Sequence, residues 1–131
     1  MVFQKGSGLN LSVLVVDDDA VIRKIHSMLL ENLGVEVQVA LNGQQAVELH
    51  RLGSSFDIVL IDMEMPVMNG PDATKELRKM GVDCLIVGVT SHALSFEKEA
   101  FIEAGVNFCF AKPLNVQKLG CILQELSKPH N

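Results

Sequence analysis

The sequence has 131 residues, of which 48% are hydrophobic, and it has a formal net charge of −5 at pH 7 and a pI near 5.3. This length fits one ordinary domain with an adequate apolar core. Because nucleic acids and anionic membranes are bound by basic surfaces, the acidic balance argues against both as partners.

The N-terminal sequence and the cysteines indicate an intracellular protein. Residues 1–10 lack the apolar stretch and cleavage site of a signal peptide, and no apolar run is long enough to span a bilayer. We therefore expect a soluble protein of the cytoplasm, with the nucleus as an additional location. Cys84, Cys109 and Cys121 are odd in number and lack CxxC spacing, which predicts reduced, buried thiols.

Five short apolar segments have the length and composition of β-strands. They cover residues 11–16, 35–40, 56–61, 84–89 and 107–111. Segments with helical spacing of apolar residues lie between them. Strands that alternate with helices in this way predict an α/β fold with one parallel sheet covered on both faces.

The helical segments show apolar stripes and recognisable ends. The residues predicted to face the core are Val21, Ile25, Met28 and Leu29 in the first, Ala73, Leu77 and Met80 in the third, and Val116, Leu119, Leu123 and Leu126 in the last. Glycines follow four of the helical segments, at positions 34, 53, 81 and 105, and Pro71 suits a first helical turn.

The composition of the strands predicts their order in the sheet. Segments 11–16, 56–61 and 84–89 are continuously apolar, as buried central strands are, whereas segment 35–40 alternates Val with Glu and Gln. Segment 35–40 should therefore form one edge and segment 107–111 the other. The order 2-1-3-4-5 satisfies these conditions and defines a flavodoxin-like doubly wound (βα)5 fold.

Polar residues follow four of the five predicted strands, at the edge where ligands of such sheets bind. These residues are Asp17, Asp18 and Asp19 after the first strand, Asp62 after the third, Thr90 and Ser91 after the fourth, and Lys112, which precedes Pro113, after the fifth. Although they are scattered along the chain, the fold brings them to one rim.

The acidic residues at this rim predict a metal site. Helix capping explains Asp19 and is the alternative explanation for the triplet, but it does not account for Asp62 on a second strand. Two carboxylates about 4 Å apart repel by roughly 4 kcal/mol at an effective dielectric constant of ~20. A divalent cation relieves this repulsion, and Mg²⁺ binds one or two carboxylates together with waters and phosphate oxygens.

Lys112 and Thr90 extend the site toward phosphoryl chemistry. The ammonium group of Lys112 suits a phosphoryl oxygen, and the Thr90 hydroxyl can donate a hydrogen bond to another. Asp62 follows the most central strand and is the best candidate for a nucleophile that forms an aspartyl-phosphate. In isolation, Lys112 could equally be a solvated surface lysine and Thr90 a turn residue. Pro113 restricts Lys112 to extended geometry and permits a cis bond.

The blocks VLVVDDD, DIVLIDMEMPVMNG, VGVTS and FAKPL occur in this order at the strand ends. Together they resemble the signature of the receiver domain of two-component response regulators over residues 11–127, which leaves 1–10 as a flexible N-terminus and 128–131 as a tail. The resemblance implies that Asp62 accepts phosphate from a phosphohistidine and that Thr90 and Lys112 contact the phosphoryl group. It also implies a Mg²⁺ site made by Asp17, Asp18, Asp62 and the backbone carbonyl of Glu64. Such a protein is a signalling phosphoacceptor that catalyses its own phosphorylation and dephosphorylation.

Within this family, the sequence looks most like the plant type-C regulators and the receivers of plant hybrid histidine kinases. That resemblance implies a histidine-phosphotransfer protein as partner, with a histidine kinase as a second phosphodonor, and a place downstream of cytokinin sensing. A monomeric, stand-alone receiver would drain phosphate from the relay by hydrolysis, as a negative regulator.

Several positions depart from the family pattern or flank the pocket. Cys109 stands three residues before Lys112, where an aromatic residue usually couples to Thr90 in the activation switch. Glu64 and His92 follow Asp62 and Thr90 by two residues and flank the path of attacking water. His92 either orients that water or is an exposed loop residue, and Ser91 either lines the pocket or packs beneath the phosphate.

The start of the first helical segment is the candidate partner surface. Val21 and Ile22 lie just beyond the acidic residues, and at least one should be exposed if Ile25 and Met28 face the core. The alternative is that both are buried. The other histidines, His26 among them, show no ligand spacing and receive no role.

Three other function classes compete with a phosphoacceptor. A haloacid-dehalogenase-like phosphatase needs a second Asp two residues after the nucleophile, where this chain has Glu64. A flavin-binding module needs a glycine- and hydroxyl-rich loop after the first strand, where this chain has carboxylates. The third alternative is an interaction module in which the phosphorylation site is vestigial.

Overall fold

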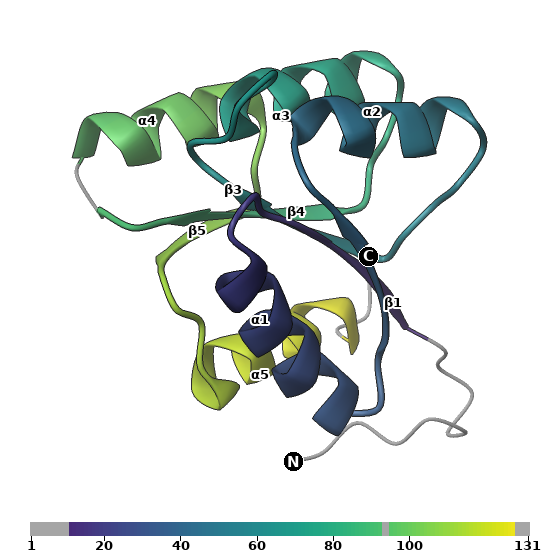
Figure 1. Cartoon of the computed structure of the whole chain (residues 1–131), viewed down its shortest axis with the longest axis vertical. Helices are drawn as coiled ribbons and strands as arrows, with labels where there is room; N and C mark the ends of the chain where they lie inside the picture. The colour runs from purple at the N-terminus through teal and green to yellow at the C-terminus, as the bar shows by residue number, and fades with distance from the viewer. Residues whose placement is uncertain (1–10, 93–94, 128–131) are drawn as a thin grey trace.

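The computed structural model describes residues 11–92 and 95–127, in which five strands and five helices alternate (Figure 1). The strands are β1 (Ser12–Val16), β2 (Glu36–Ala40), β3 (Ile58–Asp62), β4 (Leu85–Thr90) and β5 (Phe108–Ala111). The helices are α1 (Ala20–Asn32), α2 (Gly43–Arg51), α3 (Gly70–Lys79), α4 (Ser95–Ala104) and α5 (Val116–Ser127). The flexible N-terminus predicted at residues 1–10 and the tail predicted at 128–131 lie outside the described residues.

All strand pairs are parallel and the sheet order is β2-β1-β3-β4-β5, so the predicted fold and strand order are confirmed. The edge strand β2 exposes Glu36 and Gln38, as its alternating composition predicted, and also exposes Val39. Helices α1 and α5 cover one face of the sheet and α2, α3 and α4 cover the other (Figure 1). No helix of the described residues is both long and apolar enough to cross a membrane.

Alternate side chains of the central strands enter two separate cores. Val13, Val15 and Leu60 pack with residues of α1 and α5, whereas the intervening Leu14 and Ile61 pack with residues of α2, α3 and α4. Because both faces are covered, the central strands are buried along almost their whole length, and residues 13–16, 58–61 and 85–87 are apolar without interruption.

The predicted ends of the helices are largely confirmed. Gly34, Gly53, Gly81 and Gly105 have positive φ angles after their helices, a conformation that glycine adopts without steric cost. Pro71 lies in the first turn of α3. Of the predicted helix stripes, Ala73, Leu77, Leu119 and Leu123 are buried and Leu126 is half-buried, whereas Met80 and Val116 at the stripe ends are exposed.

The predicted core face of α1 is wrong for three of its four residues, since only Leu29 packs, partly buried, against the core. Val21, Ile25 and Met28 are exposed, and the buried residues of this helix are His26 and Leu30. The helix has two apolar stripes, and the one that faces the sheet contains a histidine, to which the sequence analysis assigned no role. The cysteine prediction is partly wrong: all three thiols are unpaired, but Cys84 and Cys109 are half-buried and Cys121 is exposed.

Candidate functional site

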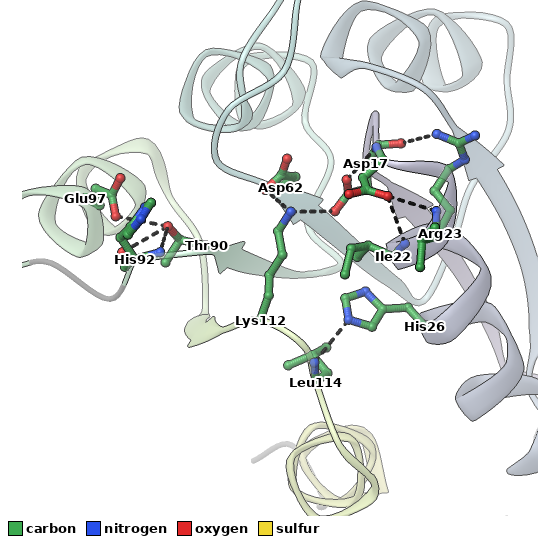
Figure 2. Close-up of polar contacts among 12 residues, drawn as sticks. Asp17, Ile22, Arg23, His26, Asp62, Thr90, His92, Glu97, Lys112 and Leu114 are labelled. Atoms are coloured by element: carbon green, nitrogen blue, oxygen red, sulfur yellow. Dashed lines mark hydrogen bonds and ion pairs between the residues drawn. The ribbon is translucent and has the colours of Figure 1, made fainter.

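The parallel register brings two of the predicted carboxylates side by side. Val16 pairs with Ile61 across β1 and β3, so the following residues, Asp17 and Asp62, lie at the same edge of the sheet. Lys112 follows β5, and its backbone N–H donates to the carbonyl of Thr90 at 2.8 Å. The lysine side chain then reaches past the end of β4 to both carboxylates (Figure 2).

Lys112 forms two buried ion pairs at this rim. Its Nζ lies 2.9 Å from Oδ1 of Asp62 and 3.1 Å from Oδ2 of Asp17. The side chains of Asp17 and Asp62 are only 3% and 5% exposed, so neither charge is compensated by bulk water. The Lys112–Pro113 peptide bond is cis, which agrees with the sequence reading of this dipeptide.

The pKa values show that the lysine does not fully offset the crowding of negative charge. Burial raises the pKa of Asp62 to about 6, and the nearby Asp17 carboxylate also raises it, while the hydrogen bond to Lys112 opposes the change. For Lys112, burial acts to lower the pKa, but the bonds to Asp62 and Asp17 outweigh it and raise the pKa above its usual value. The site therefore favours an additional positive charge.

The carboxylates fit a divalent cation. One oxygen from each of Asp17, Asp18 and Asp62 lies within 4.8 Å of the others, and Asp18 is exposed, so the cluster opens to solvent. Three carboxylates against one ammonium group leave an excess of negative charge on hard oxygen donors, which is the donor type that Mg²⁺ prefers. Asp19 stands apart, because it caps α1 by accepting from the backbone N–H groups of Val21 and Ile22.

A pocket of about 230 Å³ opens at this rim. It is lined by Asp18, Asp19, Asp62, Glu64, Thr90, Ser91, His92, Glu97 and Lys112. Ser91 and His92 are exposed at its mouth, as is the side chain of Glu64. The residues predicted after β1, β3, β4 and β5 thus meet around one cavity.

The loop after β3 folds tightly against the strand end that bears Asp62. Gly70 donates its N–H to the carbonyl of Met63 at 3.0 Å. A Cβ atom at position 70 would lie 2.2 Å from the carbonyl oxygen of Asp62, so a larger residue would displace this strand end. Glycine at position 70 therefore helps to fix the backbone of the candidate nucleophile.

The predicted switch position and the predicted partner surface lie outside the pocket lining. Cys109 is half-buried and packs against the core beneath α3 and α4. On α1, Val21 is 66% exposed and Ile22 is half-buried, so the alternative in which both are buried is wrong. Because Ile25 and Met28 are also exposed, the apolar surface of α1 is larger than the sequence predicted.

Sequence reasoning missed two buried polar residues at the site. His26 of α1 is 1% exposed and its Nε2 accepts the backbone N–H of Leu114, two residues after Lys112, at 3.1 Å (Figure 2). Glu97 of α4 is 7% exposed and its Oε1 lies 3.0 Å from the Thr90 hydroxyl. His26 stands four residues before the core residue Leu30, which was the available signal for its burial.

The family model for the response regulator receiver domain matches residues 13–124, and the chain belongs to this family. Two-component response regulator 24 of Arabidopsis thaliana is 47% identical over 117 residues, which cover 89% of this chain and 84% of that protein. Two-component response regulator ORR42 of Oryza sativa subsp. japonica is 45% identical over 132 residues, covering 100% and 97%. These relatives are type-C regulators, the plant group that the sequence blocks indicated.

Solved receiver structures agree with the fold. The receiver domain of the sensor histidine kinase PA1611 from Pseudomonas aeruginosa PAO1 has a TM-score of 0.79 and 30% identity, and the match covers 89% of this chain and 97% of that domain. That structure has a magnesium ion coordinated in its active-site cleft. The chemotaxis protein CheY4 of Vibrio cholerae has a TM-score of 0.81 and 29% identity, over 89% of this chain and 98% of CheY4.

Proposed function

We propose that the protein is a single-domain response regulator that accepts a phosphoryl group on Asp62 and loses it by hydrolysis. The observation that supports this most is the position of Asp62. It is a buried carboxylate at the end of a central strand, bonded to Lys112 and opening into a pocket lined by Thr90. We take residues 11–127 as the receiver domain and the segments on either side as additions to it.

In the proposed reaction, an Oδ atom of Asp62 attacks the phosphorus of a phosphohistidine. The O–P bond forms as the N–P bond of the donor breaks, and the released imidazole nitrogen takes up a proton. Because the pKa of Asp62 is about 6, the carboxylate is mostly ionised at pH 7 and available as a nucleophile. Lys112 and Thr90 would hold the phosphoryl oxygens as charge builds on them.

Asp17, Asp18, Asp62 and the backbone carbonyl of Glu64 would hold Mg²⁺. When bound, the ion supplies positive charge that neutralises the transferring group. The presence of magnesium at the cleft of the PA1611 receiver supports this assignment. Hydrolysis of the aspartyl-phosphate requires water to enter the pocket, and Ser91, His92 and Glu64 at its open side are the residues that this water meets.

The exposed apolar stripe of α1 would be the docking surface for the phosphodonor. Val21, Ile25 and Met28 lie on the helix that begins directly after the acidic residues, with Ile22 half-buried beside them. An apolar stripe next to a reactive pocket suits a helical histidine-phosphotransfer protein, because docking there would bring the phosphohistidine to Asp62. A histidine kinase is the second candidate donor.

The similarity to type-C regulators supports a role in plant phosphorelays, which we propose is cytokinin response. A monomeric receiver that hydrolyses its phosphate in the cytoplasm or nucleus would act as a negative regulator, because it removes phosphate from the relay. On this proposal the domain acts on no substrate other than its own phosphoryl group.

The test is phosphotransfer from a ³²P-labelled histidine-phosphotransfer protein, with and without Mg²⁺, to the native chain, Asp62→Asn and Asp83→Asn. Asp83 is an exposed carboxylate, so Asp83→Asn makes the same chemical change away from the pocket. We expect Mg²⁺-dependent loss of label from the donor with the native chain and Asp83→Asn only. Equal transfer to Asp62→Asn would refute the assignment, and no transfer to the native chain would favour an interaction module with a vestigial site.

A further inference from the structure

The hydroxyl of Thr90 already has a charged partner in the unphosphorylated protein. Oε1 of Glu97 and the carbonyl oxygen of His92 both lie 3.0 Å from Thr90 Oγ1, and the His92 N–H donates to the same oxygen at 3.2 Å (Figure 2). The hydroxyl has one proton to share between these acceptors. A hydrogen bond to a carboxylate is stronger than one to a neutral carbonyl, so Glu97 is the favoured acceptor.

The packing of α4 on β4 places Glu97 there. Phe101 is fully buried, and its ring lies so close to Gly88 that a Cβ at position 88 would be 2.7 Å from it. Glu97 precedes Phe101 by four residues and therefore lies on the same side of α4. Thr90 follows Gly88 by two residues and lies on the same face of β4, so the close contact of the two elements sets the carboxylate against the hydroxyl.

Burial makes this hydrogen bond costly to break. Glu97 is 7% exposed and lines the same pocket as Asp62 and Lys112. A buried carboxylate that loses a donor is not fully compensated by water. The bond therefore favours the position of Thr90 in which its hydroxyl is directed toward α4.

Given the proposed function, we propose that Glu97 is a positioning residue that competes with the phosphoryl group for the Thr90 hydroxyl. Phosphorylation of Asp62 has to take this hydroxyl from Glu97, which lowers the stability of the phosphorylated state. The change also reaches α4, because the carboxylate that loses its donor belongs to that helix.

This arrangement suits a receiver without an aromatic residue at position 109. Cys109 is half-buried near the same region, and burial raises its pKa, while the charge of Lys98 lowers it and that of Glu97 raises it. Its small side chain offers no ring to follow the movement of Thr90. In place of an aromatic residue at position 109, Glu97 provides the link between Thr90 and α4.

The experiment measures the affinity of beryllofluoride, a phosphoryl analogue, in the presence of Mg²⁺ by titration calorimetry. Glu97→Ala should bind beryllofluoride about tenfold more tightly than the native chain. The reason is that beryllofluoride no longer has to displace a hydrogen bond to a charged group, which contributes about this factor. Glu97→Gln keeps an acceptor and should show a smaller gain. Glu99→Ala removes the same charge from an exposed position on α4 and should leave the affinity unchanged.

A second background separates the hydrogen bond from simple charge repulsion. In Thr90→Ala the competed hydroxyl is gone, so adding Glu97→Ala should no longer tighten binding. An equal gain in both backgrounds, or a native affinity for Glu97→Ala, would overturn the role of Glu97. If the native chain itself binds no beryllofluoride and accepts no phosphate, the proposed function fails instead, which distinguishes the two failures.

Discussion

The last apolar residues of the central strands and the carboxylates that follow them are equally buried but have opposite effects on stability. Val16 and Ile61 are 1% and 0% exposed, and the next residues, Asp17 and Asp62, are 2% and 5% exposed. Burial of the first pair stabilises the fold through the hydrophobic effect. Burial of the second pair opposes folding, because two negative charges share one ammonium group. The comparison shows that the apolar core of the sheet provides the stability that offsets the cost of burying these carboxylates.

A substitution of a core residue at a strand end should give the largest change in stability. Ile61→Ala removes a fully buried side chain from the core beneath α2, α3 and α4. We expect it to lower the free energy of unfolding by about 2–5 kcal/mol, because the cavity cannot collapse fully. Urea unfolding measures this loss. Leu52→Ala, at a position just after α2 that is 81% exposed, is the control and should change the value little.

A substitution of a carboxylate at the rim, Asp62, should change the free energy of unfolding in the opposite direction. Since burial raises the pKa of Asp62 from 3.8 to about 6, its ionised form opposes folding at pH 7. Asp62→Asn should therefore raise the free energy of unfolding by up to about 3 kcal/mol without divalent ions, at 1.4 kcal/mol for each pKa unit. Asp83→Asn should leave it unchanged. A destabilised Asp62→Asn would mean that the pair with Lys112 outweighs the repulsion.

Divalent cations should reduce the cost in stability of the buried carboxylates, because a bound cation offsets their negative charge. At a Mg²⁺ concentration 100 times its dissociation constant, a site that binds only the folded state adds about 2.7 kcal/mol of stability. We expect this gain for the native chain and a much smaller one for Asp62→Asn, as measured by thermal unfolding with MgCl₂ or with EDTA. Equal gains in both proteins would place the ion elsewhere.

The smallest effect should come from His26, whose pKa is lowered by burial. Between its folded-state pKa and the usual value of 6.5, the unfolded chain binds more protons, so stability falls as the pH drops through that window. Asp62 makes stability change with pH in the opposite direction between pH 3.8 and about 6. The pH dependence due to His26 should therefore be measured in the Asp62→Asn background, where this contribution is absent. In that background, adding His26→Gln should reduce the dependence of the free energy of unfolding on pH, whereas adding His92→Gln, at an exposed residue, should not.

The sequence was sufficient for the fold and for the residues at the strand ends. Asp17, Asp62 and Lys112 could be placed together because parallel strands end at one edge, whatever the details of packing. The core face of α1 could not be read in the same way, since Val21, Ile25 and Met28 form a stripe as apolar as the buried one. Only contact with the rest of the molecule decides which stripe is buried.

The polar residues that support the site were not predictable from local patterns. His26 accepts a hydrogen bond from Leu114, a residue 88 positions away. Glu97 occurs in a charged stretch, FEKE, where a solvated helix face is the usual expectation. Its burial depends on how closely α4 approaches β4 at Gly88, which follows from the packing of Phe101.

The central claim is that the phosphoryl group is bound to Asp62, and the most direct test is to locate it. After phosphorylation with Mg²⁺, borohydride reduces an aspartyl-phosphate to homoserine, and mass spectrometry of peptides identifies the position. We expect homoserine at position 62 in the native chain and at no other carboxylate. Homoserine at position 17 or 18, or labelled protein without any homoserine, would contradict the assignment.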